Sequence, residues 1–271
     1  MDFEAARLAQ LALWAGQHAL PLFFLLLALA WAASLVGWCG LRRSQARGRT
    51  PAVSPGTGIG WRVGVGLLIS LAGGAVFAAL AAQLGAGSAL SQADQALTDA
   101  LRVSVAPLTQ QVFAVLTRLA DPATLILLGL GVALVLVVRG QRALALGWVL
   151  ALAGNGVLNP TLKQVFGRAR PLELHQLVSA TGQSFPSGHS SGAVVAYGML
   201  AYLALKLLPA RWQLPALLVA VTLVVTVGAS RVFLRVHFAS DVLAGFASGT
   251  AWLALCITGM ELLLWRRAGR S

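Results

Sequence analysis

The chain has 271 residues, of which 58% are hydrophobic and only 10% are charged, and its mean hydropathy is +0.80. This composition excludes an ordinary soluble domain, because several apolar runs approach the roughly 20 residues that span a bilayer. The formal net charge of +12 does not indicate nucleic-acid binding, since the cations lie between apolar runs rather than in a stripe with interleaved aromatic residues.

The N-terminal segments predict an interfacial helix followed by a membrane span. Residues 2–14 carry apolar side chains at a spacing that suits a short helix lying along a membrane surface. Residues 19–38 form an apolar run long enough to cross a bilayer, and no basic region precedes it, so we expect a retained transmembrane helix and no cleaved signal peptide. Residues 40–60 are rich in Arg, Gly, Ser and Pro, which predicts a flexible linker.

Six further apolar runs predict an all-α fold, a polytopic transmembrane bundle of seven helices. Residues 89–121, between the second and third spans, carry apolar side chains at helical spacing and predict one or two amphipathic helices on the membrane surface. These helices could cover a site or simply pack against the bundle, and both interpretations remain open. The predicted spans cover residues 19–38, 63–85, 123–138, 143–158, 190–208, 214–229 and 238–265.

The distribution of Lys and Arg among the loops predicts the orientation of this bundle. Spare positive charge lies in residues 40–62, 139–142, 206–211 and 266–270. The positive-inside rule makes that side cytoplasmic, so we expect the N-terminus outside and the C-terminus inside. The acids of the outer segment 89–121, which are Asp94, Asp99 and Asp121, are expected to be exposed or helix-capping rather than catalytic.

Three short segments on the predicted outer side hold the polar residues that suit phosphate chemistry. Lys163 and Arg170 are seven residues apart, which on a helix places them on one face, and Pro171 would end that helix. A Lys presents a point charge and an Arg a planar fork, and both suit phosphate oxygens.

The other two segments add hydrogen-bond donors and a paired histidine. Ser187 and Gly188 precede the run 190–208, which places them at a helix N-terminus, where free N–H groups and the helix dipole favour an anion. His237 and Asp241 are four residues apart, so one helical turn would stack them, and the carboxylate can fix the tautomer of the imidazole.

Together these segments resemble the PAP2 superfamily, the type 2 phosphatidic acid phosphatases. The family pattern is Lys, six residues and Arg-Pro, then Pro-Ser-Gly-His, then Ser-Arg, five residues, His, three residues and Asp. Every position is matched in order between Lys163 and Asp241. The resemblance implies a six-helix core, here residues 61–271, preceded in residues 1–60 by one additional N-terminal transmembrane helix and the linker.

The resemblance also implies a role for each matching residue. His237 would be the nucleophile that forms a phosphohistidine, and Asp241 would orient it. His189 would protonate the leaving oxygen and then activate water. The phosphoryl oxygens would be held by Lys163, Arg170, Ser187, Gly188 and Arg231.

Arg168 and Arg235 are not defining positions of the pattern, so for both a phosphate role and a solvated or lipid-headgroup role remain open. The family needs no metal, and the sequence shows no carboxylate cluster suited to Mg²⁺. Cys39 and Cys256 are isolated and predict neither a disulfide framework nor a metal site. We therefore expect no cofactor.

The resemblance implies a lipid phosphatase of the bacterial inner membrane with its site on the periplasmic or extracellular face. Its expected partners are membrane lipids and a lipid phosphate substrate, of the undecaprenyl diphosphate, phosphatidylglycerol phosphate, phosphatidate or lipid A type. A lipid phosphotransferase would use the same phosphohistidine and stays open as the alternative. A vanadium haloperoxidase shares the anion site, but the hydropathy argues against it. A transporter would not need both histidines and Asp241 at this spacing. The sequence predicts no oligomeric state.

Overall fold

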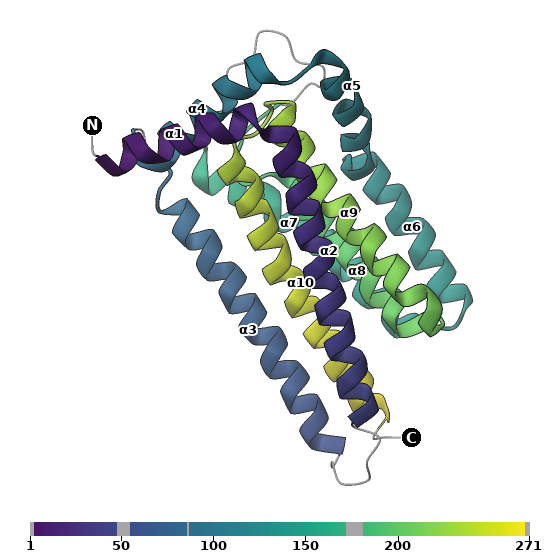
Figure 1. Cartoon of the computed structure of the whole chain (residues 1–271). Coiled ribbons are helices and arrows are strands. Elements are labelled where there is room, and N and C mark those ends of the chain that lie inside the picture. The colour runs from purple at the N-terminus through teal and green to yellow at the C-terminus, as the bar shows by residue number, and fades with distance from the viewer. Residues whose placement is uncertain (1–2, 48–54, 86, 172–180, 269–271) are drawn as a thin grey trace.

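The computed structural model describes residues 3–47, 55–85, 87–171 and 181–268. Within those ranges the chain is helical with no strand, which confirms the all-α prediction. Figure 1 shows long helices running side by side as a bundle, with shorter helices across one end and the C-terminus at the other.

Within the described part of the chain, six helices are long and apolar enough to cross a membrane. A further pair, α5 (Pro107–Leu116), continued by a short 3-10 turn, and α6 (Pro122–Val138), meets the same requirement only when taken together, with a bend of 42° between its halves. Pro122 stands at the start of α6, where its ring cannot continue the preceding hydrogen-bond ladder. The six spanning helices are α2 (Ala19–Arg47), α3 (Pro55–Ala81), α7 (Arg142–Phe166), α8 (Gly188–Leu207), α9 (Ala210–Phe233) and α10 (Ala239–Ala268).

The two helices that cross the end of the bundle are α1 (Phe3–Gln17) and α4 (Ala89–Ser104), which confirms a helix in each predicted segment (Figure 1). They pack closely, since a Cβ added at Gly16 would lie 2.4 Å from the Cβ of Ala100. The hydroxyl of Ser104 donates to the carbonyl oxygen of Gly16 at 2.7 Å. The two helices therefore form one layer over the end of the bundle, which we call the α1–α4 layer.

Most of residues 40–60 are helical, so the prediction of a flexible linker was wrong for most of that segment. Helix α2 continues to Arg47 and α3 begins at Pro55, while residues 48–54 lie outside the described part of the chain. The guanidinium of Arg42 lies 5.2 Å from the ring centre of Trp38 on α2. Stacking of this kind and an unbroken backbone ladder outweigh the low helix propensity of Gly40, which costs only about 1 kcal/mol.

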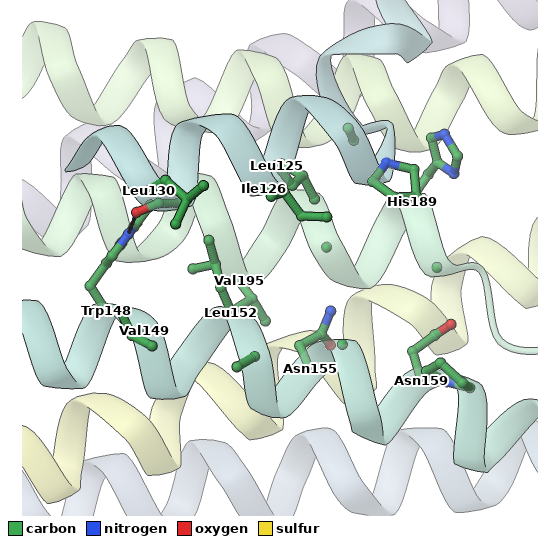
Figure 2. Close-up of a pocket in the computed structure, with 18 of the residues that line it drawn as sticks. Leu125, Ile126, Leu130, Trp148, Val149, Leu152, Asn155, Asn159, His189 and Val195 are labelled. Atoms are coloured by element: carbon green, nitrogen blue, oxygen red, sulfur yellow. Dashed lines mark hydrogen bonds between the residues drawn. The ribbon is translucent and has the colours of Figure 1, made fainter. Parts of the chain in front are cut away.

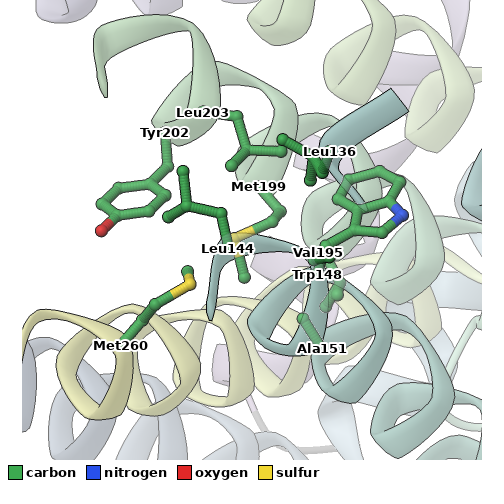
Figure 3. Close-up of a cluster of buried hydrophobic side chains, with 10 residues drawn as sticks. Leu136, Leu144, Trp148, Ala151, Val195, Met199, Tyr202, Leu203 and Met260 are labelled. Carbon is green, nitrogen blue, oxygen red and sulfur yellow. The ribbon is translucent and has the colours of Figure 1, made fainter. Parts of the chain in front are cut away.

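The main core lies between α6, α7, α8 and α10, and Figure 3 shows its side chains interdigitating around Trp148. Trp148 is fully buried, and its indole N–H donates to the carbonyl oxygen of Gly129 at 2.8 Å. A second cluster attaches α2 to the bundle, because Phe23 meets Phe113 and Phe233 edge-on, at 5.5 and 6.4 Å between ring centres. The first core holds α7 and α8 rigidly, and these helices carry the site residues described next.

Candidate active site

The site forms at the end of the bundle that the α1–α4 layer covers. The three sequence segments meet there, from the end of α7, the start of α8 and the turn between α9 and α10. Lys163 is placed by the last turn of α7, His189 by the first turn of α8, and Asp241 by the first turn of α10. The structure therefore brings together the residues that the pattern selected.

His237 precedes α10 rather than sharing a helical turn with Asp241, so that part of the prediction was wrong. Helix α9 ends at Phe233, and the chain turns through Arg235, which adopts a left-handed φ of 55°. This tight turn still aims the imidazole at the carboxylate, with 3.5 Å between Nδ1 of His237 and Oδ2 of Asp241. Ser184 lies beside both groups, since its hydroxyl oxygen is 3.3 Å from Nδ1 of His237 and its O–H donates to Oδ2 of Asp241 at 2.5 Å.

The environment of His237 favours a neutral imidazole with its lone pair on Nε2. The side chain is 2% exposed, and this burial lowers the pKa of His237 to about 3, although the bond to Asp241 acts in the opposite direction. Oxygen atoms lie near Nδ1, so Nδ1 carries the proton and Nε2 is free to act as a nucleophile. An Nη1 of Arg170 lies 3.0 Å from Nε2, which places a cation beside the reacting nitrogen.

Arg170 lies beyond α7, so the prediction that it shares a helix face with Lys163 was wrong. Gly167 ends the helix with a left-handed φ of 58°, four residues before Pro171. The Arg170 guanidinium donates to Val236 O at 2.7 Å and to the carbonyl oxygens of residues 181–183 at 3.0 to 3.3 Å. Burial lowers the pKa of Arg170 from its ordinary value, and the charge of Asp241 opposes that shift.

Two of the other predicted anion ligands occupy a helix N-terminus, as expected. Ser187 is the N-cap of α8, and its hydroxyl oxygen accepts from the backbone N–H of Ser190 at 3.4 Å. Gly188 begins the helix, where an added Cβ would lie 2.9 Å from the side-chain oxygen of Asn159. Nearby, the ammonium of Lys163 donates to Gln183 O at 2.5 Å.

Arg231 has a buried donor that no described residue satisfies. Its side chain is 2% exposed, and one Nη donates to the hydroxyl of Thr117 at 2.8 Å, while Nε has no hydrogen-bond partner within the described ranges. Lys163, Arg170 and Arg231 lie close enough to repel one another. A buried donor and three mutually repelling cations would both be stabilised by an anion.

His189 is the second histidine of the site, and its Nε2 lies 2.8 Å from Oδ1 of Asp121. The Asp121 side chain is 40% exposed, which agrees with the expectation for this residue, but its contact with His189 was not foreseen. A carboxylate at this distance orients the imidazole, and an imidazole in contact with a carboxylate can take part in proton transfer.

Arg168 and Asp94 join the site although the pattern does not include them. Arg168 donates to Oδ1 of Asp241 at 2.7 Å and to Oδ2 of Asp94 at 2.9 Å. Asp94 is 4% exposed, so the expectation of an exposed side chain was wrong, whereas the alternative of a helix cap agrees with the bond from the backbone N–H of Ser240, in the first turn of α10, to its Oδ1. The sequence held a signal for its burial, because Asp94 falls among Leu90, Leu97 and Leu101 on the apolar face of α4.

An apolar cleft of about 680 Å³ runs from the site between α6, α7 and α8. Figure 2 shows His189 and Asn159 towards one end of this cleft and Trp148 and Leu130 at the other, with Asn155 between them. Lys163 and Gly188 line the same end as His189. In the described part of the chain, no cluster of three or more His, Cys, Asp or Glu side chains is arranged to hold a metal ion.

Comparison with known proteins agrees with this geometry. The model of the PAP2 superfamily matches residues 142–265. Phosphatidylglycerophosphatase B of Bacillus subtilis is 33% identical over 169 residues, which cover 60% of this chain and 80% of that protein. The lipid A 1-phosphatase of Rhizobium etli is 32% identical over 142 residues, 47% of this chain and 55% of that protein, so the chain spans about half its length.

A solved structure shares the fold. It is the crystal structure described as the first transmembrane PAP2 type phosphatidylglycerolphosphate phosphatase, from Bacillus subtilis, with a TM-score of 0.65 and 30% identity. The likeness covers 72% of this chain and 96% of that one. With matching sequence and fold, the chain belongs to the PAP2 superfamily and is a membrane lipid phosphatase of that type.

Proposed function

We propose that this phosphatase hydrolyses the phosphate monoester or diphosphate headgroup of a membrane lipid through a phosphohistidine on His237. The observation that carries the proposal is the apolar cleft, which opens at His189 and Lys163 and continues into the bundle as far as Trp148. Its volume of about 680 Å³ is typical of a ligand site. A lipid phosphate fits this shape, because its phosphate would bind at the polar end and its hydrocarbon tail would lie along the apolar cleft.

In the first step, Nε2 of His237 attacks phosphorus and the bond to the leaving oxygen breaks. His189 gives its proton to that oxygen, and Asp121 stabilises the imidazolium beforehand. The phosphoryl group would then sit on Nε2, next to Nη1 of Arg170. In the second step, His189 takes a proton from water, the water oxygen attacks phosphorus, and the P–N bond breaks to release phosphate and restore His237.

The phosphoryl oxygens are assigned to five ligands. Arg231 offers its buried Nε, Ser187 and Gly188 offer the start of α8, and Lys163 lines the cleft beside them. Arg170 qualifies by its contact with Nε2, although its N–H groups already donate to backbone carbonyls and would have to exchange partners. Fixed cations around the equatorial oxygens stabilise the charge that phosphoryl transfer develops.

The preferred substrates are of the phosphatidylglycerol phosphate, undecaprenyl diphosphate or phosphatidate type. The names of the similar Bacillus subtilis protein and of the solved structure from that organism, phosphatidylglycerophosphatase B and phosphatidylglycerolphosphate phosphatase, favour the first of these. We further propose that residues 61–271 form the catalytic core, that the protein resides in a bacterial inner membrane, and that the site faces the periplasm or the exterior.

Phosphate release from a panel of lipid phosphates, in detergent with EDTA present, tests the proposal. We expect release from at least one of the three lipid types with EDTA present, and none from a His237→Ala variant that remains folded. If most of the phosphate is instead transferred to an added acceptor lipid and little is released, the protein is a phosphotransferase and not a hydrolase. Activity that is lost in EDTA and restored by Mg²⁺ would contradict the metal-independent mechanism.

A further inference from the structure

Asp241 is held on both of its carboxylate oxygens, by different sets of partners. Oδ2 faces His237 and also accepts from Ser184 and from the backbone N–H of Phe238, at 2.5 and 2.9 Å. Oδ1 accepts from Arg168 at 2.7 Å. Rotation of an aspartate carboxylate about its last torsion is broad, so a partner on Oδ1 fixes where Oδ2 points.

Arg168 is in turn fixed from the far side by Asp94. One Nη of Arg168 donates to Asp241 and to the hydroxyl of Ser240, both at 2.7 Å, while the other Nη donates to Asp94 at 2.9 Å. The guanidinium also lies 4.4 Å from the ring centre of Phe238. Its side chain is 10% exposed, so this bridge between two carboxylates is shielded from water and strong.

Asp94 also holds the start of α10 itself. Its Oδ1 accepts from the backbone N–H of Ser240 at 3.1 Å, and its Oδ2 accepts from the Ser240 hydroxyl. One carboxylate on α4 therefore fixes both Arg168 and the turn that carries Asp241. A residue that served only to attach α4 would not need to share its partner with the carboxylate beside His237.

We propose that Asp94 and Arg168 are positioning residues that hold the carboxylate of Asp241 in the orientation His237 needs for attack on phosphorus. The inference rests on the proposed function, since it assumes that His237 is the nucleophile. Asp94 lies on α4, outside residues 142–265 that the family model matches. The α1–α4 layer is thus part of the catalytic apparatus and not only a cover.

The N-terminal segment supports this network mechanically. Helix α1 packs against α4 through the close contact of Gly16 with Ala100 and the hydrogen bond from the Ser104 hydroxyl to the carbonyl oxygen of Gly16. Independently, Phe23 of α2 packs against Phe233, and the cluster around that ring includes Val236, the residue before His237. Both contacts lead from residues 1–47 to the two sides of the His237–Asp241 pair.

The test uses the full chain in detergent with a lipid phosphate and with nitrophenyl phosphate as substrates. We expect Asp94→Asn and Arg168→Gln each to lower kcat about 10- to 100-fold with KM within about twofold, as for other residues that orient a reacting group. The loss should be equal for the two substrates, because the orientation of the nucleophile matters whatever the leaving group. The rate of phosphoenzyme formation, measured by rapid quench, should fall by the same factor.

Conservative replacements and a double variant separate positioning from mere stability. Asp94→Glu should recover most of the rate lost in Asp94→Asn, because it restores the charge that holds Arg168. The double variant that combines Asp94→Asn with Arg168→Gln should have a kcat hardly lower than that of Arg168→Gln alone, since the two residues act in one chain of contacts. Asp99→Asn is the matched control on the same helix, because the Asp99 side chain is exposed and contacts Gln95 and Arg102 rather than the site, and it should leave kcat unchanged.

Thermal unfolding of each variant shows whether it is folded, and Arg168→Lys replaces Arg168→Gln if that variant fails to fold. The inference is overturned if kcat in the folded Asp94 and Arg168 variants stays within about twofold of the parent, or if the loss lies in KM alone. The proposed function fails separately, if His237→Ala retains turnover or forms a phosphoenzyme.

Discussion

The two histidines of the site differ in their surroundings, and the difference fits two chemical roles. His237 is almost fully buried, with an arginine at Nε2 and an aspartate and a serine near Nδ1. His189 is more exposed, at 19% of its side chain, and it lies at the mouth of the apolar cleft beside Asp121. A buried neutral imidazole suits attack on phosphorus, and an accessible imidazole paired with a carboxylate suits proton exchange with the substrate and water.

Substitution of each histidine should therefore have a different signature. His237→Ala should lose turnover by several orders of magnitude and form no phosphoenzyme with any substrate. His189→Ala should form phosphoenzyme relatively faster from nitrophenyl phosphate than from phosphatidate, because an alkoxide needs a proton to leave and nitrophenolate does not. Rapid-quench measurement with both substrates checks this. If the rate of phosphoenzyme formation falls equally with both substrates and no intermediate is trapped, His189 acts only as a phosphate ligand.

Burial of His237 should also make folding sensitive to acid. Its pKa is lowered from 6.5 to about 3 in the folded protein, so between these values the unfolded chain binds more protons than the folded one. Stability should then fall as pH drops below 6.5, by at most about 1.4 kcal/mol per pH unit from this group. Unfolding temperatures between pH 7.5 and 5 should drop less in His237→Asn. The exposed His18→Asn serves as control, and parallel curves for His237→Asn and the parent would contradict the expectation.

At the residue scale, sequence reasoning selected residues that the structure brings together, but not the residues that hold them in place. His189, His237 and Asp241 were recognisable because their spacing matches a pattern. Ser184 was not, because it acts through a long-range hydrogen bond that only the folded chain creates. For Asp94 the apolar face of α4 indicated burial, but its long-range partner Ser240 could not be read from the sequence. Arg168 stayed ambiguous for the same reason.

At the element scale, the point where α7 ends determines the positions of Arg168 and Arg170. The chain would have to remain helical to keep Arg170 on the face of Lys163, but Gly167 turns it into the left-handed region. Sequence spacing predicted a common helix face because Pro171 was taken as the stop. A glycine four residues earlier is a stop signal of its own, and here it was the effective one. The bend between α5 and α6 was not predicted either, since the sequence indicated only a separate span over residues 123–138.

Substitution at Gly167 should weaken both the helix end and the site. A Cβ there meets open space, but the φ of 58° costs a residue with a side chain about 1 kcal/mol or more. Gly167→Ala should lower the unfolding temperature and reduce kcat, while Gly167→Asn should keep more of both because Asn tolerates this conformation. Gly74→Ala is the control, since Gly74 is helical and also meets open space. Equal behaviour of Gly167→Ala and Gly74→Ala would show that the turn carries no strain.

At the scale of the whole molecule, the two ends of the bundle differ: one carries the site, and the other carries the C-terminus and a cluster of ion pairs. The site and the α1–α4 layer occupy one end, and the C-terminus lies at the other (Figure 1). Near that second end, Glu261 accepts from Arg62 at 3.0 Å and from Tyr202 at 2.6 Å, and pairs with Lys206 at 2.5 Å, which ties α3, α8 and α10 together. Hydropathy and charge predicted this division, because spans and loop charges are local properties of the sequence. They could not predict how the α1–α4 layer closes over the site, which depends on packing between distant segments.

The last prediction concerns which end faces the cytoplasm. Positive loops lie at the end opposite the site, so we expect the site outside and the turn between α6 and α7 inside. In a background of Cys39→Ser and Cys256→Ser, a membrane-impermeant thiol reagent should label Asp99→Cys on α4 in intact cells. It should label Gln141→Cys, in the α6–α7 turn, only after the cells are permeabilised. Both positions are exposed, so access and not burial decides the result. The reverse pattern would place the phosphatase site in the cytoplasm and overturn the proposed orientation.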